Sequence, residues 1–235
     1  MSRNIANYAF RTVAGVLFPA TCACCGDILM AGERQICINC LADLARTGYS
    51  PYANNPVERT LMGRVPFECA TALYHYRKGN TVQHLIHAMK FHGRSSLCTI
   101  MGRQLGLDLM GSGRFDDVDL LLPVPLHWTR KLQRGYNQSE LICQGIAEVM
   151  HRPISRGDLI RPRRTHKQSQ QKGELRIANV ENAFRVRHSD KLQGRHILLV
   201  DDVLTTGATL MACTDALAVV SGIRISVATL STVAS

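Results

Sequence analysis

One stretch near the end of the chain, HILLVDDVLTTGATLMACTDAL (residues 196–217), constrains the fold more than any other. Four aliphatic residues, Ile197 to Val200, lead straight into Asp201 and Asp202, and a hydroxyl-rich turn then opens a segment with helical spacing. A short apolar run bounded in this way is typical of a buried strand. Because ligands of parallel α/β sheets lie at the carboxyl ends of the strands, we expect both carboxylates to face a ligand.

Strand-like and helix-like segments alternate through most of the chain. The patterns predict strands at residues 70–77, 120–126, 196–202 and 224–232, and helices at residues 80–93, 95–110, 139–150 and 208–220. This order predicts an α/β fold, with a mostly parallel sheet flanked by helices. With 235 residues, 46% of them hydrophobic, the chain suits one full domain and a small module. No run approaches the roughly 20 apolar residues of a membrane span.

Five of the nine cysteines fall within residues 22–40. Cys22-x-x-Cys25 and Cys37-x-x-Cys40 are separated by eleven residues and can close a tetrahedral Zn²⁺ site. Four thiolates leave no open coordination position, so such a zinc ion would be structural. Cys24 is the alternative to Cys22; we favour Cys22 because Cys-x-x-Cys-Gly leaves room for the turn. Buried thiols without a metal remain the competing interpretation.

A linker separates this module from the rest of the chain. The stretch YSPYANNPVE has prolines, asparagines and no periodicity, so we place an N-terminal module at residues 1–55 and a second domain at 56–235. Residues 5–17 predict a short amphipathic helix that ends before Pro19. Arg11 interrupts the apolar run of this segment, which argues against a secretion signal. We therefore expect a cytoplasmic protein, in a reducing compartment where clustered thiols bind metal rather than form disulfides.

The positive charge of the chain is concentrated in one region. Residues 126–195 hold 15 Lys and Arg against 6 Asp and Glu, a net of +9 out of the total of +10. This concentration favours a phosphate-bearing partner, either a small phosphorylated ligand or nucleic acid. A solvated basic face without a partner is the alternative.

The turn that follows the two carboxylates has the composition of a phosphate-binding loop. Backbone N–H groups at a helix start are unpaired, the helix dipole favours an anion there, and threonine hydroxyls add donors. Asp201 and Asp202 can accept the two vicinal hydroxyls of a ribose, directly or through Mg²⁺. A ribose 5-phosphate therefore fits both halves, with its phosphate on Thr205, Thr206, Gly207, Ala208 and Thr209.

Residues 197–209, ILLVDDVLTTGAT, resemble at every position the 13-residue phosphoribosyl-diphosphate-binding signature of type I phosphoribosyltransferases. Further blocks are similar to the ComF family, phosphoribosyltransferase-like proteins with an N-terminal zinc-finger-like segment. These blocks are LFPATCACCG, ICINCLADL, YHYRKG, MKFHGR, LLPVPLHWTRKLQRGYNQSELI and RRTHKQSQQKGELRIANVENAF. The resemblance spans residues 16–231. It implies a type I phosphoribosyltransferase fold, binding of phosphoribosyl diphosphate with Mg²⁺, and an association with DNA uptake or use in naturally competent bacteria.

Two basic segments are candidates for the rest of the site. PVPLHWTRKLQRGYNQ (residues 123–138) can bind diphosphate through backbone amides and cations, so we add Arg134 to the catalytic pair Asp201 and Asp202. Asn137 and Gln138 join the phosphate-binding residues, although all three side chains can instead only shape the turn. Trp128 either stacks on a base or anchors the loop, and anchoring is favoured.

The second basic segment, residues 161–180, lacks any helical or strand period. Three interpretations stay open: a lid over the reacting site, a nucleic-acid contact, or solvated disorder. The lid would hold Arg164, Thr165, Gln168 and Arg176, and the nucleic-acid contact would use Arg163, Arg164 and Lys167. The histidines at 84, 87 and 92 have helical spacing but no completing carboxylate, so we interpret them as surface or half-buried residues.

These features favour a phosphoribosyltransferase-like domain with a four-cysteine zinc finger. In a catalytic protein, a base or amine would displace diphosphate from the anomeric carbon of the sugar, and Mg²⁺ and the basic loops would stabilise the leaving group. No acceptor pocket is evident after residues 224–232, which leaves turnover open. The alternative is a non-catalytic single-stranded DNA-binding or adaptor protein that keeps the ribose-phosphate site. In a third interpretation, the zinc module docks a protein of the DNA-uptake machinery.

Overall fold

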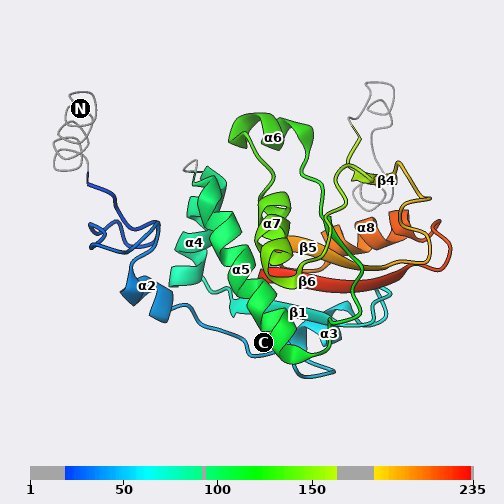
Figure 1. Cartoon of the computed structure of the whole chain (residues 1–235), viewed down its shortest axis with the longest axis horizontal. Helices are drawn as coiled ribbons and strands as arrows, with labels where there is room; N and C mark the ends of the chain where they lie inside the picture. Colours follow the sequence, from blue (N-terminus) through cyan, green and yellow to red (C-terminus); the bar gives the residue numbers. More distant parts are fainter. Residues whose placement is uncertain (1–18, 92–93, 163–182, 234–235) are drawn as a thin grey trace, which may run out of the picture.

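The computed structural model describes residues 19–91, 94–162 and 183–233 (Figure 1). Its larger helices and strands are, in chain order, α2 (Ile38–Ala42), α3 (Pro56–Leu61), β1 (Ala70–His75), α4 (Thr81–Phe91), α5 (Ser95–Ser112), β2 (Leu120–Pro123), α6 (Trp128–Arg134), α7 (Gln138–Met150), β5 (His196–Leu204), α8 (Ala208–Leu217) and β6 (Arg224–Thr232). Two short strands, β3 (Leu159–Ile160) and β4 (Arg185–Val186), form a separate antiparallel ribbon. The predicted helix at residues 5–17, His92 and residues 163–180 lie outside the described residues.

The main sheet has four parallel strands in the order β1-β6-β5-β2. The central strands β5 and β6 pair along their whole length, from His196 opposite Arg224 to Leu204 opposite Thr232. Parallel strands need crossover connections, and helices supply them throughout this sheet. The predicted α/β fold, with a parallel sheet flanked by helices, is confirmed.

Helices cover both faces of the sheet (Figure 1). The core on one face joins residues of α4, α5 and α7 to Leu198 and Val200 of β5. The core on the other face joins residues of α3 and α8 to Ile197 and Leu199. Successive strand residues point to opposite faces, so the aliphatic run of β5 contributes to both cores. This is why it is an unbroken hydrophobic run in the sequence rather than an alternating one.

Two glycines allow α5 and α7 to approach at backbone contact. A Cβ atom added at Gly102 would lie 2.2 Å from the carbonyl oxygen of Ile142, and one at Gly145 would lie 2.1 Å from that of Thr99. Neither position has room for even a methyl group. The close crossing fixes where the N-terminal end of α7 lies, and that end reaches the candidate site.

Three local features differ from the sequence-based expectations. Residues 128–134, expected as a loop, form the short helix α6. Part of the expected linker forms α3, because Asn55 caps it by accepting hydrogen bonds from the backbone N–H groups of Val57 and Glu58, and Pro56 fits the first helical turn. The ribbon of β3 and β4 was not predicted, because two-residue strands carry no period.

Strand β5 also continues past Val200, so Asp201 and Asp202 lie within the strand rather than beyond it. The neighbouring strand β2 ends at Pro123, opposite Val200, whereas β6 continues to pair with β5 up to Leu204. From Asp201 onward, β5 therefore has a ladder partner on one side only. This open edge is where other elements reach the two carboxylates.

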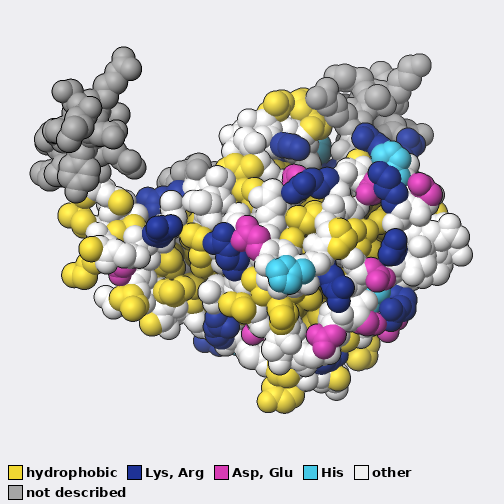
Figure 2. All heavy atoms as spheres, viewed as in Figure 1, with side chains coloured by type: hydrophobic (Ala, Val, Ile, Leu, Met, Phe, Trp, Pro, Cys, Tyr) yellow, Lys and Arg dark blue, Asp and Glu magenta, His cyan; other side chains and the backbone are white. Residues whose placement is uncertain are grey.

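The cysteine-rich segment packs against the main domain on the side of α4. Cys22, Ile36 and Cys37 belong to the same hydrophobic core as α4 and α5. The Arg94 guanidinium donates hydrogen bonds to the carbonyl and the hydroxyl oxygen of Thr21, at 2.9 and 3.3 Å. Figure 2 shows hydrophobic side chains on the outer surface of this segment. Its exposed large hydrophobic residues are Ile28, Met30, Ile38 and Leu41. In the described parts of the chain, we find no helix long and apolar enough to cross a membrane.

Candidate functional site

The two carboxylates of β5 have different partners. The Asp201 carboxylate accepts hydrogen bonds from the hydroxyl of Ser139, at 3.0 Å, and from the backbone N–H of Asp202, at 2.9 Å. The Asp202 carboxylate forms an ion pair with the Lys90 ammonium at 2.9 Å. Ser139 lies at the start of α7, and Lys90 lies in the last turn of α4. The open edge of β5 is therefore reached from two helices.

Burial and repulsion disfavour the charge on Asp201. Desolvation, followed by the neighbouring Asp202 carboxylate, raises the pKa of Asp201 from 3.8 to about 7, and the hydrogen bonds and Lys90 oppose this rise. The side chain thus exchanges its proton near neutral pH. Deprotonated, the pair would offer carboxylate oxygens, which are the ligands that Mg²⁺ prefers. The donor set therefore fits a hydrated Mg²⁺ ion or the hydroxyls of a ribose.

The turn after β5 is open to solvent. Thr205, Thr206 and Thr209 are exposed, as is Ala208 at the start of α8. Gly207 caps the helix with a φ of +81°, a left-handed conformation that favours glycine. A Cβ atom at Gly207 would also lie 2.9 Å from the Leu61 side chain. The predicted phosphate-binding residues therefore form one accessible turn next to the carboxylates.

The loop between α6 and α7 uses its amides within the protein. Asn137 caps α7 by accepting from the N–H of Ser139, and its NH₂ group donates to the Val124 carbonyl at 3.0 Å. The Gln138 NH₂ group donates to the Met89 carbonyl at 3.3 Å. Both amides are buried. These contacts hold the loop in place, which is one of the two roles that the sequence left open for Asn137 and Gln138.

Arg134 ends α6 and contacts the loop that follows. Its guanidinium donates to the Gln138 side-chain oxygen at 3.1 Å. Desolvation, followed by the charge of Arg130, lowers the pKa of Arg134, and the Asp202 carboxylate opposes this effect. Arg134 is thus within electrostatic range of Asp202.

Two residues of this site were not identified from the sequence. Lys90 lies in the MKFHGR block, and Ser139 opens a predicted helix, but neither position has a local pattern that separates it from an ordinary helical residue. Ser139 precedes Asp201 by 62 positions. The Met89 carbonyl accepts from both Tyr136 and Gln138, which ties the end of α4 to the loop and positions Lys90.

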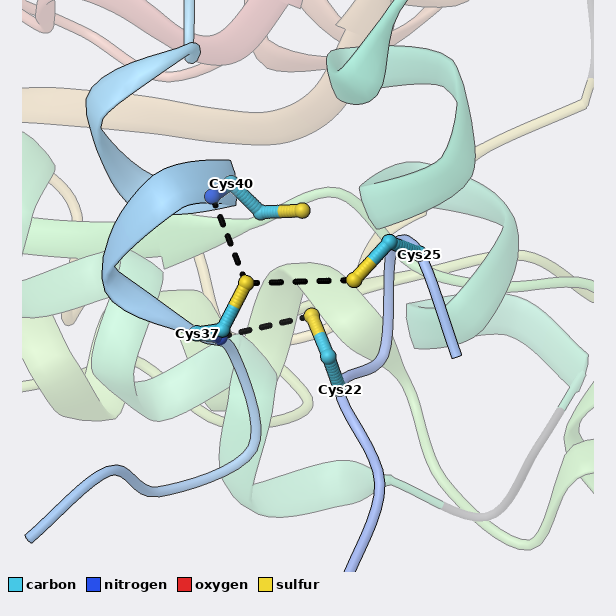
Figure 3. Close-up of side chains that lie close together, drawn as sticks. All are labelled: Cys22, Cys25, Cys37 and Cys40. Carbon is cyan, nitrogen blue, oxygen red and sulfur yellow. Dashed lines mark hydrogen bonds between the residues drawn. The ribbon is translucent and has the colours of Figure 1, made fainter. Parts of the chain in front are cut away.

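The second candidate site lies in the cysteine-rich segment (Figure 3). The Sγ atoms of Cys22, Cys25, Cys37 and Cys40 all lie within 4.8 Å of one another, and the pair from Cys25 and Cys37 is 3.8 Å apart. A Zn²⁺ tetrahedron with bonds of about 2.3 Å has edges of about 3.8 Å. The four-cysteine cluster is therefore compatible with structural zinc. Cys24, the alternative to Cys22, is not part of this group among the described residues.

Backbone N–H groups already point at two of these sulfur atoms. Cys22 Sγ accepts from the N–H groups of Cys24 and Cys37, at 3.4 and 3.3 Å. Cys37 Sγ accepts from the N–H of Cys40 at 3.4 Å, which also caps α2. Such hydrogen bonds favour thiolates over thiols, as metal binding requires. All nine cysteines are free of disulfides in the structure.

Comparison with known proteins agrees with this architecture. The family model for the phosphoribosyl transferase domain matches residues 138–235, which include Ser139, both carboxylates and the turn. The DNA utilization protein YhgH of Escherichia coli O157:H7 is 32% identical over 203 residues, 81% of this chain and 87% of the relative. The chain belongs to the ComF family. Competence protein F of Haemophilus influenzae is 26% identical over 82% of this chain and 88% of the relative. Competence protein ComFC of Bacillus subtilis is 34% identical over 39% of this chain and 35% of the relative.

Membership of the ComF family agrees with both sites described above. The phosphoribosyl transferase match contains Asp201, Asp202 and residues 205–209. It begins at Gln138, so the cysteine cluster and Lys90 lie before it. The predictions for the basic segment concern residues that lie outside the described ranges. These residues are Arg163, Arg164, Thr165, Lys167, Gln168 and Arg176.

Proposed function

We propose that this protein binds phosphoribosyl diphosphate together with Mg²⁺ at the end of β5. The observation that supports the proposal most directly is the accessible turn of residues 205–209 beside two carboxylates with different partners. The turn would hold the 5-phosphate, and Asp201 and Asp202 would hold the ribose hydroxyls. Mg²⁺, when bound, would neutralise part of the diphosphate charge.

Two cations are suited to the diphosphate end of this ligand. Lys90 is held at 2.9 Å from Asp202, and Arg134 lies within electrostatic range of the same carboxylate. We propose that both turn toward the diphosphate when the ligand occupies Asp202, with Arg134 in the catalytic set. Asn137 and Gln138 would act by shaping the loop, since their amides are engaged by protein atoms. With an acceptor present, these cations would stabilise the diphosphate as it leaves the anomeric carbon.

The names of the relatives suggest the cellular process in which this protein acts. Proteins called DNA utilization protein and competence protein suggest that this chain also acts in the use of incoming DNA. We further propose that it works in the cytoplasm with one structural zinc ion, in line with its unpaired cysteines. The residue boundary at 55 and 56 between zinc module and domain stays a prediction.

Calorimetric titration of phosphoribosyl diphosphate with Mg²⁺ tests the central proposal. Binding should disappear in the double variant Asp201→Asn and Asp202→Asn, and should persist in the matched variant Asp215→Asn, a carboxylate on the exposed side of α8. The exposed pair Thr205→Val and Thr206→Val should weaken binding by about tenfold or more, because hydrogen bonds to charged groups are lost. Equal binding by all these variants would refute the site.

A second candidate function is a non-catalytic DNA-binding adaptor, which the names of the relatives favour. Its predicted contacts, Arg163, Arg164 and Lys167, would give salt-dependent binding of single strands. Neutralising all three should then remove the binding and its salt dependence. Undiminished DNA binding in that triple variant would exclude the segment as the contact.

A further inference from the structure

A hollow lies next to the loop between α6 and α7. Its volume is about 530 Å³, and it opens between the chain that follows β2, helix α6, the start of α7 and the β3–β4 ribbon. This volume falls within the roughly 300–1,000 Å³ that is usual for small-molecule sites. Of the described residues, neither the two carboxylates of β5 nor the turn at 205–209 is among those that line it. Asn137, one of the predicted phosphate-binding residues, also lines it, so the hollow adjoins the site proposed above but excludes its carboxylates and its turn.

Four cations line this hollow, from separate parts of the chain. Lys131 comes from α6, Arg156 and Arg161 flank β3, and Arg187 follows β4. Glu140 is the acidic residue in the described lining, and its carboxylate lies 3.4 Å from the Arg156 guanidinium. The lining therefore carries a net charge of +3, from four cations and one anion. A phosphate would be attracted to such a surface.

The Arg161 side chain and the backbone at Arg187 are held in place. The Arg161 guanidinium lies 5.3 Å from the centre of the buried Phe184 ring. The backbone N–H of Arg187 donates to the Asp158 carbonyl at 2.7 Å, and the next residue, His188, contacts the Asp158 carboxylate at 2.7 Å. A guanidinium held as that of Arg161 is loses less conformational entropy when it binds an anion, and at Arg187 the backbone is fixed.

The walls of the hollow suit a planar apolar group. They include Pro123, Pro125, Leu126, Leu159 and Ile160. The indole of Trp128, 37% exposed, stands at the same hollow. Tryptophan stacks on nucleobases of any sequence. On the face seen in Figure 2, basic side chains lie close to hydrophobic ones in the region of α6 and α7.

We propose that this hollow binds a nucleotide, with its phosphate on Lys131, Arg161 and Arg187 and its base between Trp128 and the proline-lined wall. The ligand would be a free nucleoside monophosphate or the 5′-phosphorylated end of a single strand, which present the same base and phosphate. This inference does not depend on phosphoribosyl diphosphate binding at Asp201 and Asp202.

Trp128 makes the test direct, because it is the single tryptophan of the chain. Titration of the full-length protein with adenosine monophosphate should quench its fluorescence as the base stacks. A 5′-phosphorylated oligothymidylate and the same strand with a 5′-hydroxyl form the second arm. Tighter binding of the phosphorylated strand than of the mononucleotide identifies a strand end as the ligand, and the reverse order identifies the free nucleotide.

The decisive variant is Arg161→Gln with Arg187→Gln, which should weaken nucleotide binding by about tenfold or more, since charge-assisted hydrogen bonds are lost. The matched control, Arg185→Gln with Arg195→Gln, removes the same charge from exposed positions outside the hollow and should bind as the unchanged protein does. Near-ultraviolet circular dichroism checks that both variants fold. Equal affinity of the two double variants would overturn the proposal.

Two further results separate this proposal from the proposed function. Asp202→Asn should leave nucleotide quenching unchanged; its loss there would move the nucleotide to the ribose-phosphate site and overturn the inference. Inorganic phosphate should bind at least tenfold more weakly than the nucleotide, because it cannot use Trp128. Equal affinity of phosphate and nucleotide would also overturn the assignment.

Discussion

Replacing Asp201 by asparagine should stabilise the protein at alkaline pH but not at acidic pH. The pKa of Asp201 is raised from 3.8 to about 7, so between these values the folded state binds a proton that the unfolded state has released. Stability therefore falls as the pH rises from about 4 to about 7, and the full penalty is present above pH 7. Asparagine keeps the acceptor oxygen for Ser139 but carries no charge at any pH.

The magnitude follows from the same shift. The difference between 3.8 and about 7 corresponds to roughly 4 kcal/mol, at about 1.4 kcal/mol for each pH unit. Water around the partly buried carboxylate reduces this figure. We expect Asp201→Asn to raise the free energy of unfolding by about 2–4 kcal/mol at pH 8 and by less than about 1 kcal/mol at pH 4.

Urea denaturation at the two pH values provides the measurement. The chain carries a net charge of +10, so removal of an acidic group should in general be unfavourable. The exposed carboxylate of Asp215 serves as the control, and Asp215→Asn should not stabilise the protein at pH 8. The reasoning would be refuted by the same stability change at both pH values, or by destabilisation of Asp201→Asn at pH 8.

Three other perturbations test the fold and the two sites. Gly145→Ala should destabilise the protein by about 3 kcal/mol in chemical denaturation, because the new methyl group would overlap the α5 backbone. The control Gly111→Ala, at an open position of α5, should be neutral or stabilise by up to about 1 kcal/mol. Equal effects of the two substitutions would contradict the close crossing of α5 and α7. Lys90→Met should lower the free energy of unfolding at pH 8 by about 1–3 kcal/mol, since its carboxylate partner at 2.9 Å is left unpaired; an unchanged value would argue against the ion pair. Cys37→Ser should remove bound zinc, measured by mass spectrometry of the metal, whereas Cys24→Ser should retain it; zinc loss in both variants would contradict the four-thiolate cluster.

The candidate site was only partly predictable from the sequence. The order of apolar run, acids and threonines already places Asp201, Asp202 and the turn together, because they are neighbours along the chain. The cysteine spacing likewise predicts a cluster that the structure forms, since each pair is closed by a local turn. Lys90 was not predicted, because its ion pair with Asp202 depends on where α4 ends relative to β5.

The contacts of the loop before α7 were also not predictable, because they are made with distant segments of the chain. The sequence left open whether Asn137 and Gln138 bind ligand or shape the turn, since an amide does both with the same atoms. In the structure their partners are the carbonyls of Val124 and Met89, from other segments. Such partners have no signature in the local sequence.

What the sequence determined by itself is therefore the local order: the long strands and helices, the parallel sheet, and the two Cys-x-x-Cys turns whose thiols form the cluster. These properties depend on residues within one element or one turn. Tertiary structure alone decided that α5 and α7 touch through Gly102 and Gly145, that Lys90 meets Asp202, and that Arg161 and Arg187 face a common hollow. Such contacts depend on strand register and helix crossing, which distant parts of the chain set together.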